Sequence, residues 1–424
     1  MIEKTAWDVR KYPEKFAVYR ILCNFAVVFQ NCINSMEAKY IHRELSAVIE
    51  EAYRYFSVIT VTGPRQSGKT TLLRNLFSYL PYYSLENLDV RSFAENDPVA
   101  FLNQLTEGMI LDEVHNAPNL LSYIQGMVDN DADRRFILSG SSQFAMLKKV
   151  TQSLAGRTAV FELLPLSYSE IREQITDTPL DNLLFNGFYP AIYSGRNIPK
   201  FLYPAYMKTY LDKDVRDLLQ IKDMMQFHTF IRLCAGRIGS LFKASELANE
   251  IGVSSHTVTA WLSVLQASYI VFLLPPYIEN TRKRLTKTPK LYFTDTGLAC
   301  HLLGIESPEQ LARDKMRGAL FENFIVTEAL KRRYNQGKES NLYFYRDSNQ
   351  NEVDLLLKKH SGLYGIEIKS AMTYHADFEK ALKQMDGWVK ETILGKAVAY
   401  AGTLENTAGE IKLLNYSHLD EVLA

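Results

Sequence analysis

The residues that most constrain this chain are 63–70, which read Gly-Pro-Arg-Gln-Ser-Gly-Lys-Thr. They match the phosphate-binding pattern G-x-x-x-x-G-K-[ST], with an apolar run at 58–61 before it and a helix-forming run at 71–76 after it. The glycines let backbone N–H groups approach phosphate oxygens, the lysine reaches the β- and γ-phosphates, and the threonine hydroxyl is placed for Mg²⁺. This stretch predicts a nucleoside triphosphate site. The expected contacts are Gly63, Pro64, Arg65, Gln66, Ser67, Gly68, Lys69, Thr70, Thr71 and, from a later strand, Ser141.

A phosphate loop of this kind predicts an acidic element at the end of a second buried strand, and the apolar run 109–111 ends in Asp112 and Glu113. We expect Thr70 and Asp112 to hold Mg²⁺, and Glu113 to orient and deprotonate the attacking water. The alternative is that Glu113 only begins the next helix. Residues 135–142 end in serines, and Ser139 or Ser141 is a candidate γ-phosphate contact, although a serine at a strand end is often only a turn former.

Arg157 follows the sequence Leu-Ala-Gly at 154–156 and precedes the apolar run 159–161. It is a candidate arginine finger, which would stabilise transition-state charge at the site of a neighbouring subunit or of its own. A pairing of this arginine with a local acid is equally open.

Length and composition limit the domain count and the classes of partner. The 424 residues predict two to four domains, and 48 Lys and Arg balance 48 Asp and Glu. The whole molecule therefore has no field that attracts nucleic acid or an anionic membrane, so a DNA surface would have to be local. Four cysteines without metal-ligand spacing favour the cytoplasm. The apolar stretch 21–29 is too short to span a bilayer, and no membrane partner is expected.

Strand-like and helix-like segments alternate from residue 53 to about 175, with expected strands at 57–62, 82–86, 109–112, 135–139 and 159–163. This alternation predicts an α/β fold with a parallel sheet, whose ligands bind at the carboxyl ends of the strands. We divide the chain into an extension at 1–35 upstream of a natural start at Met36, a nucleotide-binding domain at 36–178, a helical lid or connector at 179–230, a winged-helix-like domain at 231–300 and a C-terminal α/β domain at 301–424.

Residues 245–262 read as a helix, a glycine-containing turn and a second helix. Two apolar strands are expected to follow, at 269–274 and 291–293. The segment between them is basic, with Arg282, Lys283, Arg284, Lys287 and Lys290. This order predicts a winged helix whose wing neutralises DNA phosphates. A protein-interaction module or spacer is equally open, because the second helix has no arginine to read guanine.

The last third of the chain holds a second group of candidate catalytic residues, Glu322, Asp354, Glu367 and Lys369. A turn at 360–362 predicts an antiparallel hairpin that brings Asp354 near Glu367, while strand alternation puts Glu367 and Lys369 on one face. Asp354 and Glu367 would hold a divalent metal, and the lysine would polarise water, as in a metal-dependent nuclease. The alternatives are a solvated charged strand face and a non-catalytic descendant of such a fold.

From about residue 37 onward these motifs resemble a prokaryotic family of AAA-type P-loop ATPases with a C-terminal restriction-endonuclease-like domain of unknown function. Residues 63–71, 111–113, 138–141, 155–157, 165–167, 290–298, 318–323, 352–354 and 366–369 carry the resemblance. It implies ATP and Mg²⁺ as ligands, ATP hydrolysis, and a nucleotide state that controls a DNA-directed module, with nuclease activity an open question. The alternative is a nucleotide-dependent switch or scaffold whose C-terminal domain binds a protein partner. An oligomer is compatible with either.

Overall fold

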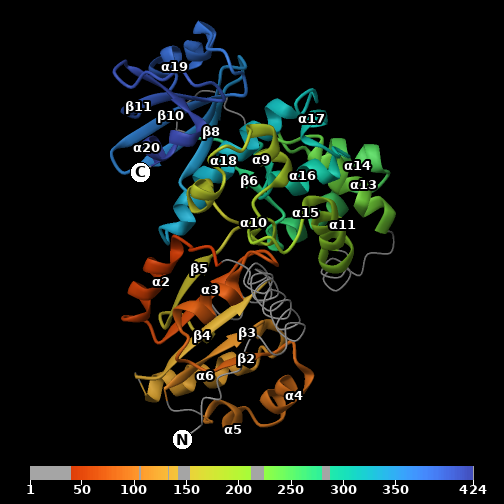
Figure 1. Cartoon of the computed structure of the whole chain (residues 1–424), viewed down its shortest axis with the longest axis vertical. Helices are drawn as coiled ribbons and strands as arrows, with labels where there is room; N and C mark the ends of the chain where they lie inside the picture. The colour runs from red at the N-terminus through yellow and green to blue at the C-terminus, as the bar shows by residue number, and fades with distance from the viewer. Residues whose placement is uncertain are drawn as a thin grey trace, which may run out of the picture.

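The computed structural model describes residues 40–104, 107–131, 133–141, 153–211, 224–278 and 287–423. The expected extension at 1–35 and the expected start at Met36 lie outside these ranges. Figure 1 shows three parts that follow one another along the chain: an α/β part at the bottom, a mostly helical part in the middle and a second α/β part at the top.

The first part is a five-stranded parallel sheet in the order β2-β3-β4-β1-β5, which confirms the expected parallel α/β fold. Its strands are β1 (Val58–Thr62), β2 (Tyr82–Ser84), β3 (Gly108–Asp112), β4 (Arg135–Gly140) and β5 (Thr158–Glu162). The helices are α2 (Leu45–Tyr53), α3 (Lys69–Leu76), α4 (Leu88–Asn96), α5 (Pro98–Leu102) and α6 (Leu120–Asn130). Strands β1 and β3 are buried along their whole length, as expected for central strands with both faces covered.

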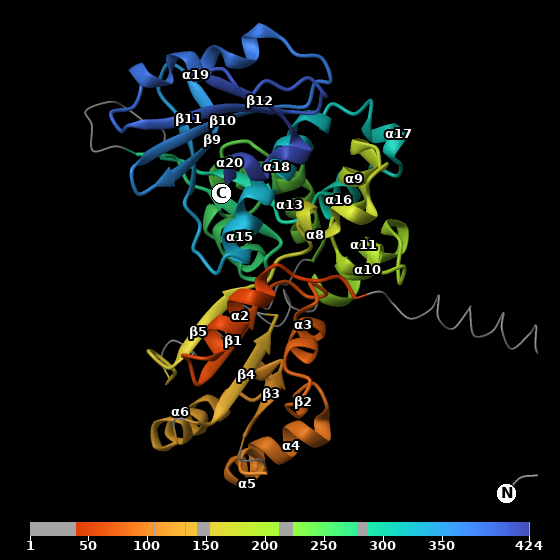
Figure 2. The same ribbon diagram turned by 60° about the vertical axis from the view of Figure 1, so that its left-hand side comes forward.

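Side chains of alternate strand residues pack into two separate apolar cores, one on each face of this sheet. Ile59 and Ile110 pack with the apolar side chains of α2 and α3, while Met109 and Leu111 pack with those of α5 and α6. Figure 2 shows these helices on either side of the strands. Because the strands are parallel, their carboxyl ends lie along one edge, where the phosphate loop, Asp112 and Ser141 all follow.

The middle part begins with the short helices α8 (Tyr168–Ile171), α9 (Leu180–Asn186), α10 (Pro190–Tyr193) and α11 (Pro199–Tyr206), and the π-helical turn Met207–Leu211. It continues with α13 (Met224–Ala235), α14 (Ala244–Ile251), α15 (Ser255–Ala267), α16 (Thr296–Leu302) and α17 (Pro308–Leu311). Strands β6 (Val271–Leu274) and β7 (Lys290–Phe293) pair antiparallel between α15 and α16.

The expected helix, turn, helix and two strands are present in this middle part. Gly252 ends α14 in the left-handed conformation, and Ser254 caps α15 by accepting a hydrogen bond from the N–H of Thr257 at 3.0 Å. Assignment of these elements to the winged-helix fold stays a prediction. Arg282, Lys283 and Arg284 of the expected wing lie outside the described residues.

The third part is a mixed sheet in the order β12-β11-β10-β9-β8. Strands β8 (Leu342–Arg346), β9 (Glu352–Lys359) and β10 (Gly362–Lys369) are antiparallel, and β10, β11 (Ile393–Tyr400) and β12 (Ile411–Asn415) are parallel. The helices are α18 (Arg317–Asn335), α19 (Lys380–Gln384) and α20 (Asp420–Leu423). The expected hairpin is therefore present, while the restriction-endonuclease-like assignment of this sheet stays a prediction.

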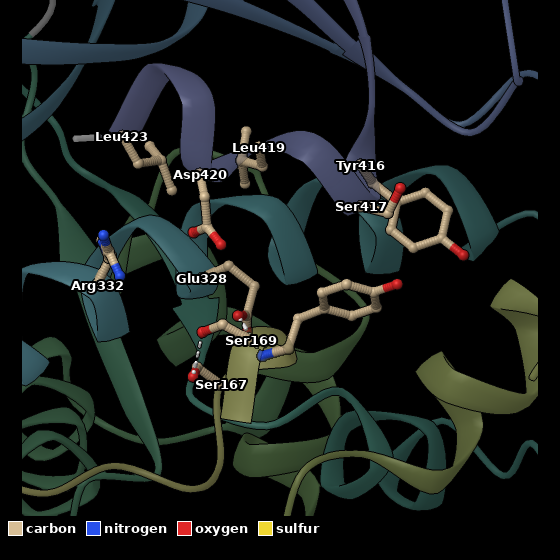
Figure 3. Close-up of a pocket in the computed structure, with 10 residues that line it drawn as sticks. Ser167, Ser169, Glu328, Arg332, Tyr416, Ser417, Leu419, Asp420 and Leu423 are labelled. Atoms are coloured by element: carbon tan, nitrogen blue, oxygen red, sulfur yellow. Dashed lines mark hydrogen bonds between the residues drawn. The ribbon is translucent and has the colours of Figure 1, made fainter. Parts of the chain in front are cut away.

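Helix α18 is joined to the segment between β5 and α8 through buried polar contacts. Lys331 Nζ donates to the carbonyl of Leu166 at 2.8 Å and pairs with Glu328, which in turn accepts from the N–H of Tyr168 at 2.6 Å. Figure 3 shows Glu328 facing the segment that contains Ser167 and Ser169, with the C-terminal helix α20 close by. A buried pair that also bonds to backbone fixes the position of α18 against the segment after β5.

Candidate functional site

The phosphate loop begins at the end of β1, and its first glycine is required by the neighbouring strand. Gly63 has φ +148°, and a Cβ atom at this position would lie 2.2 Å from the carbonyl oxygen of Leu163. The N–H of Leu163 donates to the carbonyl of Thr62 at 2.8 Å, so the segments that follow β1 and β5 are held in contact. Gly68 has φ +94° and precedes the first residue of α3. Gly68 has room for a Cβ, so its backbone conformation, and not space, favours glycine there.

Lys69 lies inside the loop, with 5 % of its surface exposed. Its Nζ donates to the carbonyls of Gly63 at 2.9 Å and Pro64 at 2.8 Å. Burial lowers the pKa of Lys69 to about 8, although the nearby charges of Glu113 and Asp112 act in the opposite direction. The ammonium group is therefore held under the loop, where a phosphate would replace backbone carbonyls as its partner.

Asp112 ends β3 and is surrounded by hydroxyl groups. Its carboxylate accepts from Thr70 Oγ1 at 2.8 Å, from the hydroxyl of Tyr82 at 2.7 Å and from the hydroxyl of Ser139. Mg²⁺ in phosphoryl-transfer sites takes one or two protein oxygens and completes its shell with water and phosphate. The donor set of Thr70 and Asp112 fits that requirement.

Glu113 follows Asp112 in a left-handed backbone conformation, φ 53° and ψ 47°. Its carboxylate accepts from the N–H of Ser141 at 3.0 Å and lies 3.2 Å from Nδ1 of His115. Burial alone would raise the pKa of Glu113, but His115 and the charge of Lys69 lower it to about 2. A strained non-glycine residue at a site is typical of functional positions. Glu113 makes no capping bond to the helical turn Val114–Asn116 that follows, so its side chain is not acting as a helix cap.

A cavity of about 460 Å³ lies over the loop, bounded on one side by Lys69, Thr70, Asp112 and Glu113 and on the other by α10 and Arg196. A second hollow of about 220 Å³ continues from it, with Ile41, Leu166 and Pro190 in its lining. Charged groups line the first space, while the second combines these apolar side chains with polar ones, including Arg43, Asn75 and Arg196. Their combined size and polarity suit a ligand with an anionic end and a flat apolar end.

Arg43 supports the loop from behind and is a residue that the sequence analysis missed. It is 97 % buried, and its guanidinium donates to the carbonyls of Ser67 and Leu164, both at 2.7 Å, and to Glu170 at 3.0 Å. No motif marks this arginine in the sequence, because its partners lie 24 to 127 positions away.

Arg157 lies at the opposite edge of the sheet from the phosphate loop. Its carbonyl accepts from the N–H of Val58, the first residue of β1, whereas the loop follows the last residue of that strand. Five strand residues span about 16 Å. Arg157 pairs with Asp129 instead, at 2.8 Å from Nη2 to Oδ2. The arginine-finger expectation stays a prediction, and this position favours the version in which Arg157 serves a neighbouring subunit.

The C-terminal candidates converge as the hairpin register requires. In the β9–β10 pairing, Leu357 lies opposite Tyr364 and Leu355 lies opposite Ile366. One residue further along the same register, Asp354 lies opposite Glu367. Lys369 Nζ lies 2.6 Å from Glu367 Oε1 and 3.6 Å from Asp354 Oδ2. Burial and the charge of Asp354 raise the pKa of Glu367, against the effect of Lys369. The lysine thus occupies the space between the two carboxylates expected to hold a metal.

Lys290 also enters this cluster, which the sequence analysis did not foresee. It was expected on an exposed basic wing, but only 3 % of its surface is exposed. Its Nζ lies 2.6 Å from Glu352 Oε1 and 3.1 Å from Glu322 Oε1, and the hydroxyl of Tyr292 donates to the same Glu322 oxygen at 2.6 Å. We call Glu322, Glu352, Asp354 and Glu367, with Lys290 and Lys369, the carboxylate cluster. Among the residues that the structure describes, no three or more Asp, Glu, His or Cys side chains are grouped as metal ligands.

The helices of the described ranges include none that is long and apolar enough to cross a bilayer.

Fold and site together define an AAA-type P-loop ATPase domain. Residues 55–172 match a family model described as an AAA domain, and residues 177–309 and 317–419 match two models described as domains of unknown function, DUF8612 and DUF4143.

The chain belongs to the same family as the uncharacterized protein Rv2008c of Mycobacterium tuberculosis. The two are 31 % identical over 340 residues, which cover 78 % of this chain and 74 % of that protein. The uncharacterized protein MJ1544 of Methanocaldococcus jannaschii is 23 % identical over 364 residues, 78 % of each chain.

Two solved structures align with part of this chain. The Walker-type ATPase PABY2304 of Pyrococcus abyssi aligns with a TM-score of 0.43 and 14 % identity, over 61 % of this chain and 94 % of that one. A RuvB variant of Thermotoga maritima aligns with a TM-score of 0.29 and 16 % identity, over 55 % and 88 %. At these scores the likenesses are too distant to support a functional argument.

Proposed function

We propose that this protein binds ATP with Mg²⁺ and hydrolyses it, and that its nucleotide state controls the C-terminal part of the chain. The observation that carries this proposal is the convergence of Lys69, Thr70 and Asp112 at one end of a cavity of about 460 Å³. An ammonium group, a hydroxyl and a carboxylate in this arrangement are what a triphosphate with its metal needs.

Each side chain has a distinct role in the proposed reaction. Lys69 contacts the β- and γ-phosphates, and Thr70 and Asp112 are placed to hold Mg²⁺, which would neutralise charge on the phosphate oxygens when bound. The backbone N–H groups of residues 65–71 are proposed to surround the phosphates. The base is expected in the adjoining hollow, against the apolar side chains of Ile41, Leu166 and Pro190.

Glu113 is proposed to orient the attacking water. Its low pKa keeps it a carboxylate at neutral pH, and Ser141 holds the carboxylate in place. With a pKa of about 2 it is a weak base in the resting site, so it accepts a hydrogen bond from the water first and takes a proton as the transition state forms.

Phosphate release from purified full-length protein, with ATP and Mg²⁺, tests this function. Wild-type protein should turn over, and Glu113→Gln should bind ATP without turnover. The same assay at increasing protein concentration tests the proposal that Arg157 acts at the nucleotide site of a neighbouring subunit. If it does, the activity per mole of protein should rise as the subunits associate. No nucleotide binding by wild-type protein would refute the proposal.

A second candidate function is metal-dependent DNA cleavage by the C-terminal part, possible only if the carboxylate cluster can release its lysines. It is favoured by one observation: Oε2 of Glu367 is buried and has no hydrogen-bond partner among the described residues. The competing proposal is a non-catalytic C-terminal domain that binds a protein partner. Linear, supercoiled and single-stranded DNA with Mg²⁺ or Mn²⁺ distinguishes the two, because Asp354→Asn should abolish cleavage and leave ATP hydrolysis unchanged.

The domain limits 36–178, 179–230, 231–300 and 301–424, DNA contact through the middle part and a cytoplasmic location belong to the same proposal. Stimulation of ATP turnover by DNA would support a DNA-directed module. A turnover rate that DNA does not change would favour the nucleotide-dependent switch or scaffold that binds a protein partner.

A further inference from the structure

Tyr269, at the junction of α15 and β6, reaches from the middle part to the base of the phosphate loop. Its hydroxyl lies 2.7 Å from Oγ1 of Thr62 and donates to Oε1 of Glu162 at 3.0 Å. Thr62 and Glu162 are partners in the β1–β5 register, and Thr62 directly precedes Gly63. Glu162 also lies near Tyr334, close to the end of α18: burial and the charge of Glu162 raise the pKa of the Tyr334 hydroxyl. Three parts of the chain therefore meet at one buried point beneath the loop.

The backbone of Tyr269 is strained, which indicates that its position is imposed by its surroundings. Its φ is +56°, a conformation that bulky residues rarely adopt. The N–H donates to the carbonyl of Gln266 at 2.9 Å, and the carbonyl accepts from the hydroxyl of Thr294, the residue after β7. Tyr269 is thus clamped between the end of α15 and the end of β7.

The four-residue strand β7 leads from this clamp directly to the carboxylate cluster. Thr294 contacts Tyr269 at one end, while Tyr292 and Lys290 both contact Oε1 of Glu322. A strand of this length is a stiff unit, about 13 Å long. A displacement of Tyr269 would therefore be passed to Glu322 without any intervening loop.

On the other side, the loop base has little freedom to move alone. The carbonyls of Gly63 and Pro64 hold Lys69, so a phosphate that draws Lys69 upward competes with these bonds. Gly63 is wedged against Leu163, and Thr62 and Leu163 share a backbone hydrogen bond. A rearrangement at the start of the loop therefore acts on Thr62 and, through it, on the hydroxyl of Tyr269.

We propose that Tyr269 is a positioning residue that couples nucleotide binding at the phosphate loop to the position of the β6–β7 hairpin and the carboxylate cluster. The inference rests on the proposed ATP binding. The β6–β7 hairpin would have two arrangements, and nucleotide binding would change the fraction of molecules in each.

Hydrogen exchange on the full-length protein tests this coupling. Exchange is measured with and without a non-hydrolysable ATP analogue and Mg²⁺, in peptides covering 63–76 near the loop and in peptides covering 255–274 and 290–294. Wild-type protein should change in both regions. Tyr269→Phe keeps the ring and removes the hydroxyl, so it should bind the analogue within about threefold of wild type and keep the change at 63–76, while the change at 255–274 and 290–294 falls by at least about half.

Tyr400→Phe is the matched control, because it also removes one hydroxyl from a buried tyrosine, whose hydrogen bond goes to Leu404 in the C-terminal part. It should behave as wild type. If Tyr269→Phe folds poorly, Thr62→Val removes the partner hydroxyl with little change in shape and should give the same loss. An unchanged distant response in a folded variant overturns the inference, as does a wild-type response confined to 63–76. Absence of any nucleotide binding would instead refute the proposed ATP site.

Discussion

The hydroxyl of Thr70 lies 2.8 Å from Oδ2 of Asp112, although the two residues are 42 positions apart. Thr70 is in the first turn of α3, and Asp112 is the last residue of β3. Because β1 and β3 run in the same direction, with β4 between them, the helix that follows one and the carboxylate that ends the other share an edge of the sheet. The predictions below begin from this edge.

Replacing Lys69 by alanine should strongly weaken ATP binding. The change removes a charge-assisted contact of about 1.5–3 kcal/mol, which alone weakens the Kd by roughly 10- to 150-fold. Calorimetric titration measures it. Lys338→Ala, at an exposed lysine far along the chain, is the matched control and should keep wild-type affinity.

Replacing Glu113 by glutamine should separate binding from hydrolysis. The amide keeps the shape and one acceptor for Ser141 but loses the charge that orients water, so phosphate release should fall by about 10²- to 10⁴-fold while ATP affinity stays near wild type. Glu107→Gln, at an exposed glutamate just before β3, should change neither quantity. Normal turnover in Glu113→Gln would remove Glu113 from the mechanism.

Nucleotide affinity should weaken as the pH rises through about 8. Burial lowers the pKa of Lys69 to about 8, so the free protein loses the ammonium charge in that range, and ATP binding must then restore a proton. The effect of pH on the stability of the fold has the opposite direction. Because the pKa of Lys69 is lower in the folded state, the unfolded chain binds more protons between about pH 8 and 10.5. The contribution of Lys69 to the free energy of unfolding therefore increases with pH in this range. Affinity titrations from pH 6.5 to 9.5 check the first effect, and Lys69→Arg, which stays charged, should bind with no such decline.

Replacing Arg43 by methionine should weaken both the fold and the nucleotide site. The change removes the cation that faces the carbonyls of Ser67 and Leu164 and the carboxylate of Glu170, which then keeps only its bonds from the N–H groups of Glu44 and Ser167. Removing one member of a buried charged pair typically costs about 3–5 kcal/mol. Thermal unfolding and the KM for ATP measure the two effects. Arg54→Met, at an exposed arginine just after α2, should leave both unchanged, and equal behaviour of the two variants would contradict the assigned support of the loop.

Replacing Lys290 by methionine should destabilise the C-terminal part, because the partly buried carboxylates of Glu322 and Glu352 then lose their shared buried cation and repel each other. Mn²⁺ should raise the melting temperature of this variant more than that of wild type, since a cation can replace the lost charge. Lys287→Met, at an exposed lysine three positions earlier, is the control. A Lys290→Met protein as stable as the control would show that Lys290 is not essential to the cluster.

Local sequence patterns were sufficient for the elements that follow short-range rules. Gly63 to Thr70 define a loop between a strand and a helix, and the apolar runs around Ile59, Ile110 and Ile137 define buried parallel strands. The spacing of Asp354, Glu367 and Lys369 about one tight turn was sufficient to place them side by side. In each case the interacting residues are connected by a single element or turn whose geometry is known in advance.

The sequence by itself therefore determined that this chain has a phosphate loop, an acidic strand end and a charged hairpin. The tertiary structure decided what surrounds them: Arg43 behind the loop, Tyr269 beneath Thr62, Lys290 inside the carboxylate cluster, and Arg157 paired with Asp129 at the opposite edge of the sheet. The contacts of Arg43 and Tyr269 join residues 24 to 207 positions apart. Arg157 directly precedes β5 and therefore lies at the amino end of that strand. The reason is physical: whether a polar side chain is exposed or buried depends on how separate elements pack, and that packing is set by the whole apolar core rather than by neighbours in sequence.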